Sequence, residues 1–176
     1  MNLLQHDSAA GFDAPLDLLE ACHGRIAQQC ATLEKLCGHL QRHGNDAAAG
    51  QAAAAICKYF RQAAPLHHED EEENLFHLLL ARLDAEHAAV GELLALLAGQ
   101  HRVLDDLWAR LEGELEAVAQ GTSAHLSNAL AEEFAARNRA HLALENDRVL
   151  PAARALLTPA DLARLGQAMR ARRGVA

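Results

Sequence analysis

The sequence predicts an all-α fold, an up-down-up-down four-helix bundle followed by a short fifth helix. Half of the residues are apolar (51%) but only 3% are aromatic, and alanine and leucine supply most of the apolar content, which is typical of helices. Residues that favour strands are scarce, and no stretch of strand length alternates apolar and polar residues. Apolar residues instead recur every three or four positions, as they do along one face of an amphipathic helix.

The chain is long enough to form one domain with its own core. Its 176 residues need no disulfide bonds to bury a sizeable apolar interior. We expect residues 1–13 to form a flexible N-terminal arm, residues 14–157 to form the bundle, and residues 158–176 to form the short helix and a tail.

The first two helices begin at residues that favour helix starts. Asp13 and Pro15 mark the start of the first helix, because aspartate caps helices and proline is tolerated in the first turn. This helix ends before Gly44. The second helix begins near Asp46 and is expected to continue to about Arg82.

The remaining helices follow the same logic. The third is expected over about residues 85–120, with a glycine after its end. Ser123 is the expected N-cap of the fourth, which runs to about residue 157. Thr158 is the expected N-cap of the short fifth helix, with Asp161 as its capping-box partner.

Charge and cysteine content narrow the classes of protein. The formal net charge is −8, from 24 acidic and 16 basic residues, which argues against nucleic acid or an anionic membrane as the main partner. The 4 cysteines form no CxxC motif, and we interpret Cys30 and Cys37 as small core residues. There is neither an apolar signal segment nor an apolar run long enough to span a bilayer. We therefore expect a cytoplasmic protein.

A dense carboxylate run at residues 67–76 is the strongest functional signal. Like charges at i,i+4 spacing destabilise a helix, and a bound cation would neutralise them. Within the run, His67 and Glu71 are four residues apart and share one helix face, as two ligands of one metal site would. The same spacing recurs at His141 and Glu145. Two copies of His-x-x-x-Glu indicate two facing helices around one polar site.

Histidines also interrupt the apolar stripes of the first and third helices. His23 lies 20 residues before the expected end of its helix, and His67 lies 21 residues after the expected start of the next one. Across the second turn, His67 and His101 lie 15 and 16 residues away, and across the third, His101 and His141 lie 19 and 18 residues away. Short connections make such helices antiparallel neighbours, so the histidines are predicted to meet at one level. His87, the main alternative to His101, lies almost at the second turn.

Simpler interpretations exist for each of these residues. The His-x-x-x-Glu pairs could form a solvated charged face, and a lone histidine on an apolar stripe is usually a core residue. Four histidines and two glutamates buried together without a cation would, however, be a costly unpaired network. Asp105 is a candidate extra ligand, or an acceptor for a ligand. The rest of the run is expected mostly on the solvated or outer side of the helix: His68, Glu69, Asp70, Glu72 and Glu73.

The ligand types indicate the metal. Two carboxylates and four imidazoles in a bundle core suit two metal ions bridged by the glutamates. Ligation by nitrogen and oxygen without thiolate favours iron, with manganese or zinc as substitutes. Six protein ligands leave positions for an oxo or hydroxo bridge and a small molecule. We expect apolar walls that restrict access to the site: Ile26, Phe60, Leu97, Leu104 and Phe134.

These motifs also have a familiar arrangement. In chain order they are His23, His67-His68-Glu69-Asp70-Glu71-Glu72 with Leu75-Phe76, His101, and His141-Leu142-Ala143-Leu144-Glu145 with Leu150-Pro151. Over roughly residues 15–157 the chain resembles the hemerythrin-like, or HHE cation-binding, proteins. The resemblance implies a four-helix bundle with a non-haem di-iron centre in which both glutamates bridge. The ligands that it implies are His23, His67, Glu71, His101, His141 and Glu145. Oxygen carriers of this family have a fifth histidine where this sequence has Asp105.

The sequence therefore leads to three functional hypotheses. The first is a di-iron protein that binds, senses or detoxifies a small ligand (O₂, NO or H₂O₂), with iron-centre repair or iron handling as a variant. The second is a di-iron oxidase or peroxidase. The third is a metal-free helical interaction module. A redox partner is expected for the first two, while the oligomeric state stays open.

Overall fold

The computed structural model describes residues 11–175, and all regular structure within that range is helical. The elements are α1 (Pro15–His43), α2 (Ala47–Asp70), the π-helical turn η1 (Glu71–Leu75), α3 (Phe76–Leu80), α4 (Ala88–Ala119), α5 (Asn128–Leu144), the π-helical turn η2 (Glu145–Val149), α6 (Leu150–Leu156) and α7 (Pro159–Arg172). The predicted all-α class is confirmed.

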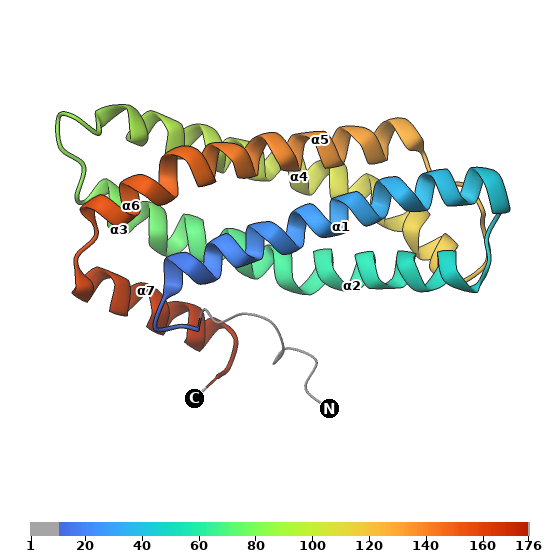
Figure 1. The fold of residues 1–176 in the computed structure, drawn as a ribbon, viewed down its shortest axis with the longest axis horizontal. Coiled ribbons are helices and arrows are strands. Elements are labelled where there is room, and N and C mark those ends of the chain that lie inside the picture. Colours follow the sequence, from blue (N-terminus) through green and yellow to red (C-terminus); the bar gives the residue numbers. More distant parts are fainter. Residues whose placement is uncertain (1–10, 176) are drawn as a thin grey trace.

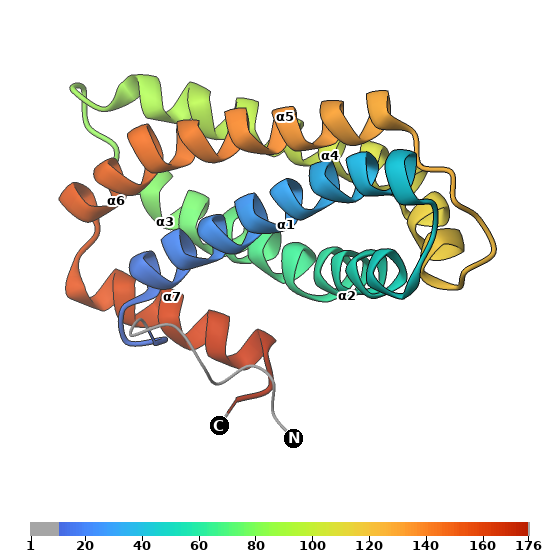
Figure 2. The ribbon, with the colours of Figure 1, turned by 45° about the vertical axis from the view of Figure 1, so that its right-hand side comes forward.

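The long helices lie side by side and share one interior (Figure 1). α1 packs against α2 and α5, and α4 packs against the same two helices. α2, η1 and α3 follow one another as a single rod, as do α5, η2 and α6 (Figure 2). α7 lies outside these rods, near the start of α1, where it contacts α1, α2 and η1. The chain therefore forms a helical bundle with one additional helix packed on its side.

Two of the predicted helix starts are confirmed. The Asp46 side chain accepts a hydrogen bond from the Ala49 amide at 2.9 Å and caps α2. Thr158 and Asp161 form the predicted capping box of α7. Pro15 is the first residue of α1, but its N-cap is Ala14, which makes no side-chain capping bond. The prediction that Asp13 caps this helix was wrong.

The start of the fourth rod also differs from the prediction. Ser127, not Ser123, is the N-cap of α5, and its hydroxyl accepts from the Leu130 amide. Contacts from other parts of the chain select the later serine. Asn45 donates to the Ser123 carbonyl at 2.6 Å, and Glu114 accepts from the Ser127 amide at 2.6 Å. These bonds satisfy the backbone of the connection in a non-helical form.

A layer of polar residues divides the core into two apolar clusters. The larger cluster lies toward the α1–α2 turn and contains Ile26, Phe60 and Phe134. The smaller lies toward α3 and α6 and contains Leu75 and Leu97. Apolar side chains above and below therefore shield whatever lies between them from water. None of the helices in the described range is long and apolar enough to cross a membrane.

α7 closes the bundle beside the second apolar cluster. Leu165 and Met169 are fully buried there. Phe12 packs over the same helix, and a Cβ atom at Gly166 would lie 2.0 Å from the Phe12 carbonyl oxygen, so this close approach requires glycine. Most of the predicted N-terminal arm, residues 1–10, lies outside the described residues.

Candidate metal centre

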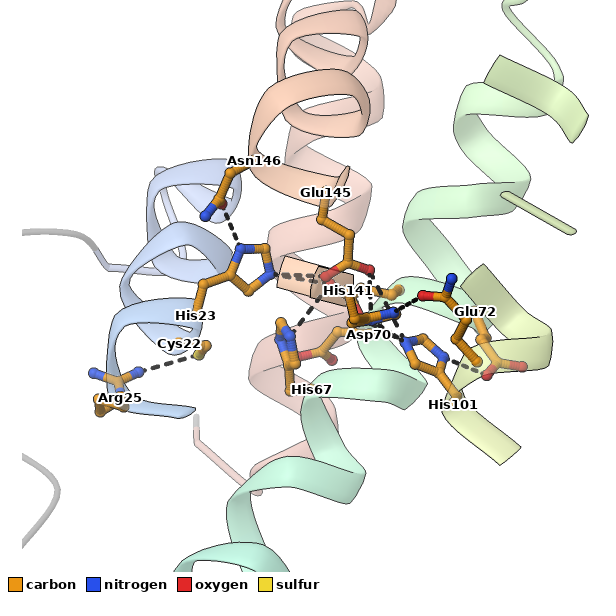
Figure 3. A network of polar contacts seen from close by, with 12 residues as sticks. Cys22, His23, Arg25, His67, Asp70, Glu72, His101, His141, Glu145 and Asn146 are labelled. Carbon is orange, nitrogen blue, oxygen red and sulfur yellow. Dashed lines mark hydrogen bonds and ion pairs between the residues drawn. The ribbon is translucent and has the colours of Figure 1, made fainter. Parts of the chain in front are cut away.

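The structure brings all six predicted ligands together in the middle of the bundle (Figure 3). They are His23 of α1, His67 of α2, Glu71 of η1, His101 of α4, His141 of α5 and Glu145 of η2. Each is at most 3% exposed. The level argument from the sequence therefore placed the four histidines correctly, and His87, the alternative to His101, is the N-cap of α4 and contacts Asp84 at 2.7 Å.

The six side chains form two overlapping groups that share both carboxylates. One group is His23, His67, Glu71 and Glu145, which we call the His23/His67 half, and the other is Glu71, His101, His141 and Glu145, which we call the His101/His141 half. Within each half, one ligand atom from every residue lies within 4.8 Å of the others. Each half thus offers two nitrogen and two oxygen donors.

Glu71 directs one oxygen toward each half. Its Oε1 lies 3.3 Å from Nε2 of His23 and 3.3 Å from Nε2 of His67. Its Oε2 lies 3.5 Å from Nε2 of His101. A carboxylate with one oxygen beside each set of imidazoles is placed to bridge two cations.

Glu145 makes the corresponding arrangement from the opposite helix. Its Oε2 lies 3.3 Å from Nε2 of His23. Its Oε1 lies 3.2 Å from Nε2 of His141 and 3.9 Å from Nε2 of His101. Both glutamates therefore span the two halves, and neither half is complete without them.

Oxygen atoms behind the cluster fix the orientation of three imidazoles. The Nδ1 atoms lie 2.6 Å from Asn146 Oδ1 for His23, 2.6 Å from Glu72 Oε1 for His101, and 2.9 Å from Gln100 Oε1 for His141. Because each partner is an acceptor, each Nδ1 carries the proton, and the Nε2 lone pair is left facing the cluster. Metal-binding histidines in proteins are held in this way.

Several buried polar atoms of the cluster make no hydrogen bond among the described residues. They are both ring nitrogens of His67, Oε2 of Glu71 and both carboxylate oxygens of Glu145. The Nε2 atoms of His101 and His141 lie 2.9 Å apart, but with both Nδ1 atoms protonated they present two lone pairs to each other. Such contacts are unfavourable without a cation. The donor set therefore fits a metal ion in each half.

Burial keeps the imidazoles in the form that binds metal. Removal from water holds the pKa of His67 well below its ordinary value and lowers the pKa of His101 to about 4. Burial also raises the pKa of Glu71 well above its ordinary value, with the neighbouring Glu145 carboxylate as the next cause. Two carboxylates this close cannot both stay ionised at low cost unless positive charge lies between them.

Comparison with known proteins agrees with this geometry. A family model for the hemerythrin HHE cation-binding domain matches residues 14–153. The chain belongs to this family. An uncharacterized protein of Haemophilus influenzae is 31% identical over 175 residues, which cover 99% of each chain. Family membership and the buried histidine and glutamate cluster together indicate a metal-binding domain.

Two π-helical turns in this hemerythrin-like bundle were not predicted from the sequence. η1 begins at Glu71 and η2 begins at Glu145, so each turn opens on a shared carboxylate. π-helical turns are rare and frequently mark functional sites. The sequence did hold a signal, because buried positions recur at steps of four in both rods: 67, 71, 75 and 79, then 141, 145, 149 and 153. An α-helix, with 3.6 residues per turn, would rotate these side chains away from the core.

Two residues of the carboxylate run lie deeper than predicted. Asp70 was expected on the solvated or outer side, but it is fully buried and ion-paired with Arg172 and Arg173 at the end of α7. His68 is only partly exposed and stacks on His101, with 3.9 Å between ring centroids. Both corrections follow from packing by other helices, which the spacing within one helix does not reveal.

The other outer residues lie as predicted. The side chains of Glu69 and Glu73 are 49% and 67% exposed, and Glu72 supports His101. Asp105 was a candidate extra ligand, but its side chain is 71% exposed, it lies 4.0 Å from Nδ1 of His68, and it belongs to neither half. The structure therefore gives Asp105 no place among the candidate ligands.

A cavity of about 220 Å³ adjoins the polar layer on the side of the larger apolar cluster. Four of the five predicted apolar walls line it: Ile26, Phe60, Leu104 and Phe134. Leu97 instead packs in the smaller cluster, on the other side of the polar layer. Trp108 also lines the cavity.

Proposed function

We propose that this protein holds two iron ions in an up-down-up-down four-helix bundle and binds a small ligand, O₂, NO or peroxide, at that centre. One ion would lie in the His23/His67 half and the other in the His101/His141 half, with Glu71 and Glu145 bridging them. Manganese or zinc are the substitutes that the same donors accept.

The shared carboxylates are the observation that carries the proposal. A single cation would need only one half, whereas Glu71 and Glu145 each place one oxygen beside the imidazoles of both halves. Carboxylates that serve two sets of imidazoles are typical of bundles with two metal ions. The absence of a cysteine among the candidate ligands in the described residues favours iron.

The surrounding residues determine what the centre can do. When bound, the two iron ions supply one-electron redox chemistry and coordination positions for a small ligand. The carboxylates of Glu71 and Glu145 stabilise the oxidised metals, because hard anionic oxygens favour the higher charge. The imidazoles, oriented by Asn146, Glu72 and Gln100, keep the reduced state accessible. The apolar clusters on both sides exclude bulk water.

The metal-free interaction module is less favourable on physical grounds. It would leave the buried carboxylate oxygens of Glu145 and both nitrogens of His67 without hydrogen bonds. Each unsatisfied buried polar group costs roughly 1–3 kcal/mol, and the cost of an unpaired buried charge is higher. A cation removes these costs together.

Iron loading of the purified chain tests the proposal. The metal-free protein is loaded anaerobically with Fe²⁺, desalted, and measured for iron per chain and for its optical spectrum before and after addition of O₂ or NO. We expect about two iron ions per chain and a new absorption band with at least one of the two gases. Retention of less than about one ion per chain, with an unchanged spectrum, would overturn the proposal in favour of the interaction module.

A matched pair of variants separates ligand binding from turnover. Glu71→Ala removes a bridging carboxylate, and His77→Ala removes an exposed histidine of the following helix. If peroxide is consumed catalytically by the wild type and by His77→Ala but not by Glu71→Ala, the centre acts as an oxidase or peroxidase. If the spectrum changes without turnover, the centre binds or senses its ligand.

A further inference from the structure

The cavity beside the candidate metal centre is formed by residues one helical turn from the ligand histidines. Ile26 follows His23 by three residues in α1, and Leu104 follows His101 by three in α4. On the two rods of opposite direction the order is reversed: Ala64 precedes His67 by three, and Asn138 precedes His141 by three. A helix rises about 1.5 Å per residue, so the cavity begins roughly 5 Å from the imidazoles. It therefore lies directly beneath the proposed iron centre.

The cavity is larger than a diatomic ligand or peroxide requires. Its volume is about 220 Å³, whereas a dry apolar cavity of about 150 Å³ in another protein holds benzene. Aromatic rings form much of its wall, with Phe60 and Phe134 at 5.0 Å and Phe60 and Trp108 at 5.0 Å between centroids. These walls suit a flat apolar ring.

One polar side chain in this apolar wall has an unused acceptor. Asn138 is 3% exposed, and its Nδ2 donates to the Phe134 carbonyl at 2.9 Å. The amide oxygen Oδ1 consequently faces away from that carbonyl, and it accepts no hydrogen bond from the described residues. A ligand with one hydroxyl or amino hydrogen would satisfy it.

The entrance of the cavity disfavours anions. Asp105 is exposed at the cavity rim. The one cation in the lining, Arg61, is already paired with the carboxylates of Glu112 and Glu116. Three carboxylates against one guanidinium leave a negative field around the opening. The electrostatics therefore favour a neutral ligand.

We propose that this cavity binds a neutral, single-ring aromatic molecule with one hydrogen-bond donor, a phenol, with its ring among Phe60, Trp108 and Phe134 and its hydroxyl donating to Asn138. This inference deepens the proposed function, on which its link to the iron centre rests. Filling the cavity does not itself require the metal, because none of these groups belongs to the candidate ligands.

The test is a titration with phenol, benzene and benzoate, followed by calorimetry and by the fluorescence of Trp108, the only tryptophan of the chain. It is performed on the iron-loaded and the metal-free protein. We expect saturable binding of one phenol per chain, weaker binding of benzene, and no binding of benzoate. Benzoate that binds as tightly as phenol, or phenol that does not saturate, would overturn the proposal.

Three variants locate the ligand. Asn138→Leu keeps the volume but removes the acceptor, so phenol should bind roughly tenfold more weakly while benzene is unaffected. Ala64→Leu fills the cavity and should abolish binding of both rings, whereas the matched control Ala63→Leu, outside the cavity lining, should bind like the wild type. Unchanged phenol affinity in Ala64→Leu would place the ligand elsewhere and contradict the proposal. If Ala64→Leu does not fold, the comparison of Asn138→Leu with wild type decides.

The two proposals fail in different ways. Phenol bound to a protein that retains no iron would contradict the proposed function and leave the cavity assignment intact. Two iron ions retained by a protein that does not bind phenol would contradict only the cavity assignment.

Discussion

The two halves of the candidate centre have the same donors but different supports. In the His101/His141 half, His101 donates to the carboxylate of Glu72 and His141 donates to the amide oxygen of Gln100. In the His23/His67 half, His23 donates to the neutral Asn146, and Nδ1 of His67 makes no hydrogen bond among the described residues. The halves are thus equivalent in their ligands and unequal in what lies behind them.

This difference indicates that the two metal positions have different affinities. A carboxylate behind an imidazole makes the imidazole a more basic ligand and fixes its orientation more firmly than an amide does. Stacking of His68 on His101 further restricts that ring. We therefore expect the His101/His141 half to bind its ion more tightly and to fill first.

The largest effect is expected from removal of a ligand that both halves share. Glu71→Gln replaces the bridging carboxylate with a neutral amide, so metal should be lost from both positions, to less than about one ion per chain. Metal content after desalting measures this. The control is Glu73→Gln, two residues along the same turn with an exposed side chain, which should keep both ions. Two ions retained by Glu71→Gln would show that the carboxylate does not bridge.

Removal of one histidine from each half should have a smaller and selective effect. His67→Ala and His141→Ala should each retain about one ion per chain, because each leaves the other half with its four donors. The ion left in His67→Ala should bind more tightly than the ion left in His141→Ala, and competition with a chelator compares them. Loss of both ions from either variant would contradict independent halves.

The supports behind the imidazoles give a still smaller difference. Glu72→Ala should weaken metal binding in the His101/His141 half by roughly 10–100-fold. Asn146→Leu, which removes a neutral acceptor of similar size, should weaken the other half by about tenfold or less. Chelator competition again provides the measurement. A larger loss in Asn146→Leu than in Glu72→Ala would reverse the inferred order of the halves.

A change of pH should act on both halves alike and distinguish them least. In the metal-free protein, burial lowers the pKa of His67 well below 6.5, of His68 to about 3 and of His101 to about 4. The unfolded chain therefore takes up three protons near pH 6.5 that the folded chain does not. Glu71 opposes this with one, since burial raises its pKa above 4.5.

The sign of the pH effect follows from this balance. Because the unfolded chain binds more protons, the free energy of unfolding should decrease as the pH falls from about 6.5 to about 4.5. Thermal melting of the metal-free protein across that range should show a falling Tm. A Tm that rises on acidification would mean that protonation of the glutamates, not of the histidines, dominates.

Much of this arrangement could be predicted from the sequence because it depends on spacing along helices. The i,i+4 pairs His67/Glu71 and His141/Glu145 and the equal distances of the histidines from the turns were sufficient to place the six candidate ligands together. Features that depend on contacts between distant segments could not be predicted. The burial of Asp70 requires Arg172 and Arg173, about one hundred residues later in the chain. The supports Gln100 and Asn146 likewise become visible only when the helices are assembled.

The most direct measurement is anomalous X-ray scattering from crystals of the iron-loaded protein. The account predicts two iron peaks roughly 3.5–4 Å apart, one between His23 and His67 and the other between His101 and His141, with Glu71 and Glu145 contacting both. A single peak, or peaks outside these six side chains, would contradict it.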